Sequence, residues 1–135
     1  MTDVLVDSNV ILDILTEDPN WFDWSASVLS EYAEQGELVI NPIIDSEIST
    51  YFPRIEELDA LLTPERFRRD QLPYSAGFLA GQAFVSYRRR GGERRSPLPD
   101  FYIGAHAIVA NLPLLMGDTN RYRTYFSQAT LITPD

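Results

Sequence analysis

Short, unbroken apolar runs alternate with longer stretches of helical periodicity along this chain of 135 residues. The apolar runs are 4–6, 38–40, 112–116 and 130–132, and residues 67–72 have a weaker strand pattern. Strands without polar alternation are typical of parallel sheets that are buried on both faces. We therefore expect an α/β protein with a three-layer fold, in which helices flank a central parallel sheet.

The intervening stretches predict six helices. Their expected ranges are 8–15, from a cap at Asn20 to Gly36, from Pro42 onward, 54–62, 73–90 and about 100–110. At about 100° per residue, Trp21 and Ile55 fall on the inward stripes of the second and fourth helices. The fifth helix has small residues at Ala76, Gly77, Ala80 and Gly81, for which close packing and self-association both stay open.

Length and composition limit the class of protein. A chain of 135 residues accommodates one domain with a substantial core, so we expect 1–135 to be a single domain. It has no cysteine, which excludes disulfides, thiolate metal sites and cysteine nucleophiles and suits a reducing cytoplasm. Neither a basic leader nor an apolar run long enough to span a membrane is present, so we expect no export.

Four acidic residues are predicted to meet at one edge of the sheet. Asp7 and Asp118 each follow an apolar strand, and the carboxyl ends of parallel strands share an edge where ligands bind. The helix that starts at Asp100 returns through a short turn into the strand before Asp118, so its beginning must lie nearby. Glu47, just over one turn inside the helix after the second strand, approaches the same crevice.

Clustered carboxylates repel one another, and a divalent cation removes that repulsion. An all-oxygen donor set without histidine or thiolate suits Mg²⁺, with Mn²⁺ as a substitute. Such an ion binds phosphates and lowers the pKa of a bound water, which indicates hydrolysis of phosphodiesters. Each acid also has a simpler interpretation, because Asp7 and Asp100 suit helix N-termini, Glu47 suits a solvated helix face and Asp118 suits a turn.

Basic residues are unevenly distributed. All 11 are arginines, and 20 acidic residues give a formal charge of −9. A basic cluster within this acidic chain is nevertheless suited to contact RNA phosphates, the alternative being a solvated helix end. The cluster consists of Arg88, Arg89, Arg90, Arg94 and Arg95. The single histidine, His106, lies inside a predicted helix and is given no role.

With these residues in view, nearly the whole chain resembles a PIN domain, and in particular a VapC-type toxin ribonuclease of a type II toxin-antitoxin pair. The similarity lies in four segments: Val6 to Val10, Asn41 to Glu47, Leu98 to Ala107, and Asp118 followed by Tyr122 to Phe126. The third segment, with Pro99-Asp100-Phe101 and Gly104-Ala105-His106-Ala107, is the most specific.

The resemblance implies a Mg²⁺-dependent endoribonuclease with Asp7, Glu47, Asp100 and Asp118 around the metal. It also implies an RNA substrate, neutralisation by a cognate antitoxin, and assembly as a homodimer or a larger toxin-antitoxin complex. An antitoxin helix could occupy a groove between the first two helices, where we expect Leu12, Leu15 and Trp24. An alternative is a PIN-like domain that binds RNA or protein without cutting.

One position departs from the family pattern. The family commonly has a hydroxyl residue two positions before the last acid, where this chain has Met116. Thr119 or Asn120 could supply the missing hydrogen bond near the metal ligands, and Asn9 is a further supporting residue.

Other classes of acid-bearing α/β protein fit the sequence poorly. Phosphoacceptor domains of the receiver and haloacid-dehalogenase types need a lysine, which this chain lacks, and position 9 is Asn9 where the dehalogenases have a second aspartate. A metal-dependent adhesion site would need Asp-x-Ser-x-Ser, and residues 7–11 do not match it.

Overall fold

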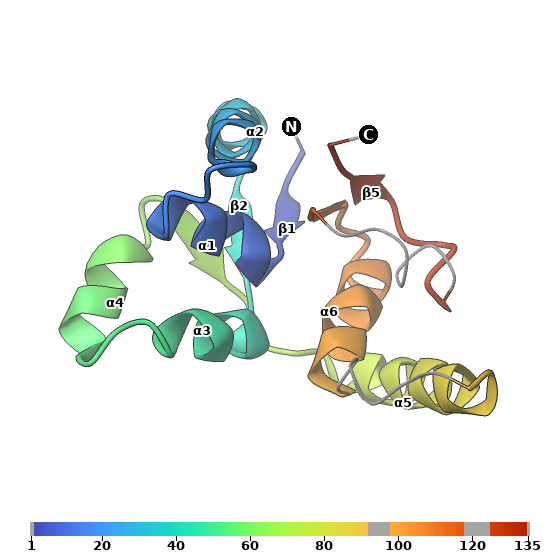
Figure 1. Ribbon diagram of the computed structural model, residues 1–135. Coiled ribbons are helices and arrows are strands. Elements are labelled where there is room, and N and C mark those ends of the chain that lie inside the picture. The colour runs from blue at the N-terminus through green and yellow to red at the C-terminus, as the bar shows by residue number, and fades with distance from the viewer. Residues whose placement is uncertain (1, 92–97, 118–124, 135) are drawn as a thin grey trace.

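A five-stranded parallel sheet forms the centre of the protein in a computed structural model, which describes residues 2–91, 98–117 and 125–134 (Figure 1). The strand order is β3-β2-β1-β4-β5, and every neighbouring pair is parallel. The strands are β1 (Val4–Val6), β2 (Leu38–Ile40), β3 (Phe67–Arg69), β4 (Leu114–Leu115) and β5 (Leu131–Ile132). The predicted three-layer α/β fold is confirmed.

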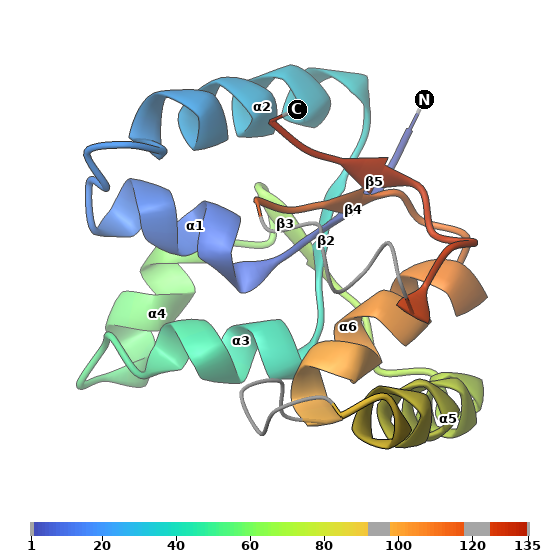
Figure 2. The same cartoon turned by 45° about the vertical axis from the view of Figure 1, so that its right-hand side comes forward.

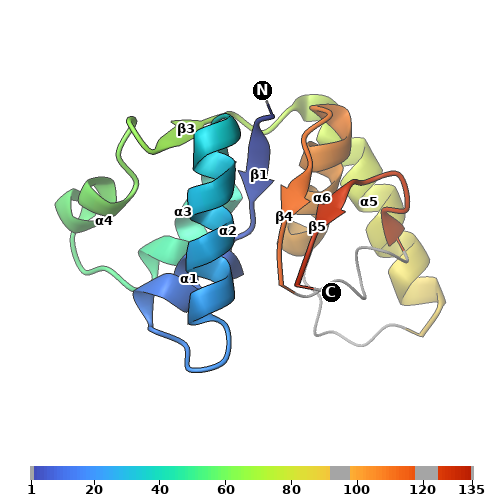
Figure 3. The same ribbon diagram turned by 90° about the horizontal axis from the view of Figure 1, so that it is seen from above.

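Helices cover both faces of this sheet. They are α1 (Ser8–Leu15), α2 (Phe22–Gln35), α3 (Pro42–Ser49), α4 (Ile55–Leu61), α5 (Tyr74–Arg89) and α6 (Leu98–Val109). The connections from β1 to β2 and from β2 to β3 step one way, and the connection from β3 to β4 steps back past β1. Right-handed crossovers therefore place α1 and α2 on one side of the sheet and α5 with α6 on the other (Figure 3).

The central strand explains the unbroken apolar pattern. Val4, Leu5 and Val6 of β1 have no exposed surface, because β2 and β4 flank the strand and helices cover both of its faces. The same applies to Leu114 and Leu115 of β4. Alternating polar residues would have been buried here without partners, so only apolar side chains are stable.

The sequence signals place most helix ends correctly. Asn41 caps α3, with its Oδ1 accepting hydrogen bonds from the amides of Ile43 (3.0 Å) and Ile44 (2.9 Å). Helix α5 ends before Gly91, whose φ of 77° is easily adopted by glycine. The cap of α2 was predicted wrongly. The helix begins at Phe22, because Asp18 instead accepts from the amides of Asn20 and Trp21 and holds that turn.

Two apolar side chains predicted to face inward are exposed. Ile55, at the first position of α4, is 67% exposed, and Trp21 is 43% exposed. Both precede or open a helix, where no preceding turn covers the side chain. Of the residues expected to pack in α4, Leu58 and Leu62 are buried.

Close packing of α5 on α6 uses the small residues of both helices. Ala76 and Ala80 are fully buried, so tight packing, one of the two possibilities left open for these small residues, is what this face of α5 shows. In α6, a Cβ added at Gly104 would lie 2.6 Å from Cδ2 of the buried Phe126. Only glycine therefore lets the aromatic ring of Phe126 rest on α6.

The topology brings three segments to one edge of the sheet. The chain leaves β1 toward β2 on one side, while β4 lies on the other, so a crevice is expected beyond the carboxyl end of β1. Helix α3 follows β2, and α6 leads into β4; the two helices pack against each other (Figure 2). None of the helices in the described part of the chain has the length and apolarity to cross a membrane.

Candidate functional site

Asp7 stands at the carboxyl end of β1 and opens α1. Its extended backbone (φ −67°, ψ 148°) places the carboxylate beside the helix start, where Oδ1 accepts from the Ser8 amide at 2.9 Å. The residue is only 8% exposed. Both interpretations of Asp7 thus hold together, because the residue caps α1 and also lies at the edge where the site was predicted.

Glu47 reaches the same edge from α3 through a contact that the sequence did not predict. Its Oε1 accepts a hydrogen bond of 2.8 Å from Oγ of Ser8, so Ser8 lies between Asp7 and Glu47. Burial raises the pKa of the Glu47 carboxyl above its usual value, the Ser8 hydroxyl lowers it in part, and the negative charge of Asp100 raises it further. The carboxylates therefore influence one another's charge.

Asp100 lies in the first turn of α6 and is partly buried. Its effect on Glu47 places it within electrostatic reach of that side chain. Asp118, Thr119 and Asn120 lie outside the described residues. Within the ranges 2–91, 98–117 and 125–134, no three acidic or histidine side chains group closely enough to hold a metal ion. The assignment of the four acids as metal ligands stays a prediction.

Asn9 adds a buried polar atom beside this edge. Its Oδ1 is buried and has no hydrogen-bond partner among the described residues. Its Nδ2 is 3.7 Å from the position that a Cβ on Gly117 would occupy, so the amide lies next to the residue that precedes Asp118. A buried oxygen without a partner costs free energy, which a ligand or water could recover. Met116, in contrast, is fully buried and offers no hydroxyl.

The oxygen-rich chemistry of these side chains fits a hard divalent cation. Asp7, after β1, and Glu47, on α3, both contact Ser8, and the charge of Asp100, on α6, contributes to the raised pKa of Glu47. The buried amide oxygen of Asn9 has no partner among the described residues. A cation would remove the repulsion between Glu47 and Asp100 that raises this pKa.

The sequence did not predict a buried polar pair between the start of α3 and α6. Nδ1 of His106, in α6, lies 2.9 Å from Nδ2 of Asn41, and both residues are at most 2% exposed. Because Oδ1 of Asn41 accepts from two amides of α3, its Nδ2 donates and His106 must accept as a neutral imidazole. Burial lowers the pKa of His106, the negative charge of Asp70 opposes this, and the positive charge of Arg68 adds to it. The pair links the helix of Glu47 to that of Asp100.

The signal for this pair was a single histidine in an otherwise apolar helix. A buried polar side chain needs a partner, and Asn41, directly before Pro42, was a candidate. Nothing in the sequence, however, indicated that two residues 65 positions apart would be adjacent.

The described arginines of the basic cluster lie at the exposed end of α5, and they are Arg88, Arg89 and Arg90. The guanidinium carbon of Arg88 lies 5.8 Å from the ring centre of Phe84, and that of Arg90 lies 5.6 Å from Tyr125. Arg94 and Arg95 lie outside the described residues. The contact of these arginines with RNA stays a prediction.

Three solved structures have folds similar to that of this chain. The structure resembles VapBC2 from Rickettsia felis bound to a DNA fragment from its promoter, with a TM-score of 0.73, 16% identity, and 99% of this chain and 100% of that chain covered. It also resembles VapBC-1 from nontypeable Haemophilus influenzae (TM-score 0.74, 16% identity, 98% of each chain). A toxin-antitoxin complex from Klebsiella pneumoniae gives a TM-score of 0.71 at 16% identity, with 98% of each chain covered.

At this level of identity the structural likeness establishes the fold. No curated protein matches the sequence. The sequence model of the PIN domain matches residues 4–127, which include the strands β1 to β4 and the helices α1 to α6 of the described part of the chain. This chain belongs to the PIN domain family.

Proposed function

We propose that this protein is a Mg²⁺-dependent endoribonuclease and the toxin of a type II toxin-antitoxin pair. The observation that carries the proposal is the placement of Asp7 and Glu47 around Ser8 at the carboxyl edge of the sheet of a PIN domain, with Asp100 acting electrostatically on Glu47. The likeness to chains of VapBC complexes supports the toxin assignment.

In this proposal Asp7, Glu47, Asp100 and Asp118 would hold the ion, which would supply an activated water and neutralise charge on the phosphodiester. Ser8 holds Glu47 toward the site through the 2.8 Å hydrogen bond, so that the carboxylate needs little reorientation on binding. Asn9, Thr119 and Asn120 support the ligands. The arginines at the end of α5 bind phosphates of the RNA, because a chain with a charge of −9 needs a local basic surface to approach it.

Metal binding is tested first by thermal unfolding. Adding Mg²⁺ or Mn²⁺ at about one hundred times its Kd should stabilise the folded protein by about 2.7 kcal/mol, because the ion binds only the folded state. That corresponds to a rise in Tm on the order of 5–10 °C. The same ions should support cleavage of total RNA, and EDTA should abolish it.

Asp13 provides a matched control for the metal experiment. Like Glu47, Asp13 is a partly buried acid whose pKa is raised by burial. Its Oδ2 accepts a hydrogen bond of 2.8 Å from the hydroxyl of Ser25. Asp13 lies on α1 and is not one of the predicted metal ligands. Asp13→Asn should keep the metal-induced shift in Tm, and Asp7→Asn should lose it. Identical melting curves of the wild-type protein in EDTA and in Mn²⁺ would contradict the metal site. Binding of RNA without cleavage would favour the alternative, a PIN-like domain that does not cut RNA.

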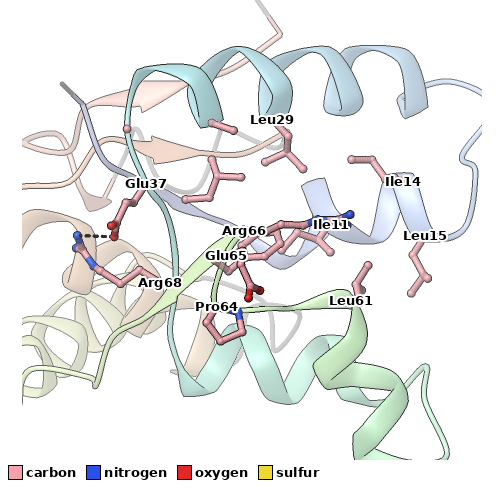
Figure 4. Close-up of a pocket in the computed structure, with 14 residues that line it drawn as sticks. Ile11, Ile14, Leu15, Leu29, Glu37, Leu61, Pro64, Glu65, Arg66 and Arg68 are labelled. Carbon is pink, nitrogen blue, oxygen red and sulfur yellow. Dashed lines mark hydrogen bonds and ion pairs between the residues drawn. The ribbon is translucent and has the colours of Figure 1, made fainter.

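A pocket of about 460 Å³ between α1, α2, α4 and β3 supports an antitoxin partner (Figure 4). Its apolar lining consists mainly of Ile11, Ile14, Leu15, Leu29, Leu61 and Phe67. Glu37, Glu65, Arg66 and Arg68 also line it, so apolar and charged faces of an amphipathic helix would both find partners. The pocket lies partly between α1 and α2, where the groove was predicted. Leu15 lines the pocket, but Leu12 and Trp24 pack against the core and do not.

Substitution in this pocket should weaken antitoxin binding. Ile14→Ser removes apolar surface that a bound helix would bury, so the Kd for the protein encoded beside this one should rise about tenfold or more. Trp24→Ala, outside the pocket, is the comparison and should bind nearly as the wild type does. Isothermal titration of both variants measures the difference. Equal loss in the two variants would contradict the assignment of the pocket.

A further inference from the structure

A small polar pocket lies beside the first turn of α3, on the side of the helix away from Glu47. Its volume is about 190 Å³, and it is lined by Ile40, Asn41, Pro42, Asp45, Arg69 and Gln71. At 3.6 residues per turn, Asp45 is turned about 200° from Glu47 around the axis of α3. The pocket is therefore separate from the edge where Asp7 and Glu47 lie, and the proposed reaction does not use it.

Asp45 brings to this pocket an acceptor that the protein leaves unused. Its Oδ1 is buried and has no hydrogen-bond partner among the described residues. A buried acceptor without a partner costs free energy. The carboxylate turns easily about its terminal bond, so a donor that enters the pocket can pair with this oxygen. Asp45 is thus placed to recognise N–H groups of a ligand.

Arg69, the last residue of β3, brings donors to the same pocket. Its Nη2 donates to Oδ1 of Asp59 at 2.9 Å and to the carbonyl oxygen of Leu62 at 3.0 Å, and these bonds hold the guanidinium in place. The described residues provide no acceptor for its Nε or Nη1. Arg69 forms its ion pair with Asp59 and not with Asp45, so the charges of Asp45 and Arg69 both remain for a ligand.

These two charges together select a neutral ligand with both donors and acceptors. Arg69 repels a cation, and Asp45 repels an anion. The volume is below the roughly 300–1,000 Å³ of pockets for drug-sized ligands, so it suits a single flat ring system. Pro42 adds an apolar surface for the face of such a ring. A nucleobase turned out of a single RNA strand has these properties.

Guanine fits the two side chains better than the other bases. Its N1–H and its N2 amino group donate side by side, which matches the two oxygens of a carboxylate. Its O6 and N7 accept side by side, and they are the usual partners of an arginine. Adenine, cytosine and uracil each lack one of these two pairs.

We propose that this pocket binds a guanine base of the RNA and thereby contributes to the choice of the cleavage site. The inference rests on the proposed function, because it requires that RNA crosses this edge of the sheet. The pocket and the acids lie on opposite sides of α3, whose diameter is about 10–12 Å. A stacked strand advances about 3.4 Å per nucleotide, so the guanosine should lie on the order of three nucleotides from the cut.

Binding of short RNAs in EDTA tests the pocket without requiring cleavage. The probes are oligouridines with guanosine, adenosine or inosine at the central position, and fluorescence anisotropy measures their Kd. The wild-type protein should bind the guanosine RNA about tenfold or more tightly than the adenosine RNA. Inosine lacks the N2 amino group, so its RNA should bind with intermediate affinity.

Asp45→Asn should remove most of the difference between guanosine and inosine. The amide keeps one acceptor oxygen but places an NH₂ group where the second N–H of guanine needs an acceptor. Asp23→Asn removes the same charge from the first turn of α2 and should keep the difference. Circular dichroism checks that both variants are folded.

Equal binding of the three RNAs by the wild-type protein, or an unchanged preference in Asp45→Asn, would overturn the inference. Loss of antitoxin binding in Asp45→Asn with unchanged RNA binding would also overturn it and would assign the pocket to the protein partner. The proposed nuclease activity fails separately. A preference for guanosine without cleavage in Mg²⁺ would support the pocket and refute only the nuclease, whereas cleavage without this preference would refute only the pocket.

Discussion

Asp100→Asn is expected to reduce the rate of RNA cleavage at least about 100-fold and to leave the fold intact. The substitution preserves size but removes a charged metal ligand, and loss even of a group that only supports a ligand costs 10–100-fold. Asp7→Asn should behave alike. Cleavage of a labelled RNA in Mg²⁺, with circular dichroism as the check on folding, measures the effect.

A second measurement separates loss of a ligand from general damage. The charge of Asp100 contributes to the raised pKa of Glu47, so in Asp100→Asn the pKa of Glu47 should fall toward its usual value. Carboxyl NMR of the metal-free protein reports this directly. Removing the repulsion should also raise the free energy of unfolding in the absence of metal. Asp13→Asn should change neither cleavage nor the titration of Glu47. Wild-type cleavage by Asp100→Asn, or inactivity caused only by unfolding, would refute the assignment.

His106→Leu is expected to lower the free energy of unfolding by about 1–3 kcal/mol at pH 7, because it leaves Nδ2 of Asn41 buried without an acceptor. Asn41→Ser keeps a helix-capping residue but removes the donor. In a double-mutant cycle the two substitutions should therefore cost less together than the sum of their separate costs. Urea unfolding measures all four proteins. Full additivity would show that the contact contributes nothing.

The stability difference between the wild type and His106→Leu should depend on pH. In the unfolded chain His106 takes up a proton near its usual pKa of 6.5, whereas in the folded protein burial lowers that pKa. Between the two values the unfolded state binds more protons, so the wild-type stability rises with pH through this window and is constant above it. The leucine variant lacks this titration. Its disadvantage should therefore shrink as the pH falls from 7 to 5, and a constant difference would contradict the neutral, buried histidine.

The amino-acid pattern was sufficient for the parallel α/β fold and for most helix ends. The strands at 4–6 and 38–40 are apolar without alternation, as expected for strands buried on both faces. Helix caps such as Asn41 with Pro42 could be predicted because they act within a few residues. The same logic predicted that Asp7, Glu47 and Asp100 approach one edge, because parallel strands fix where each following helix starts. Their metal-binding role, with that of Asp118, stays a prediction.

What depends on contacts between distant residues could be decided only by the tertiary structure. The hydrogen bonds of Ser8 with Glu47 and of His106 with Asn41 join residues 39 and 65 positions apart, and no local periodicity encodes such pairs. The place of the apolar pocket and the direction of Trp21 and Ile55 depend on which neighbouring element covers a side chain. Even the small residues of α5 were ambiguous in sequence. Packing on α6 buries Ala76 and Ala80, and only that packing shows that Phe78 and Tyr74 remain outside it.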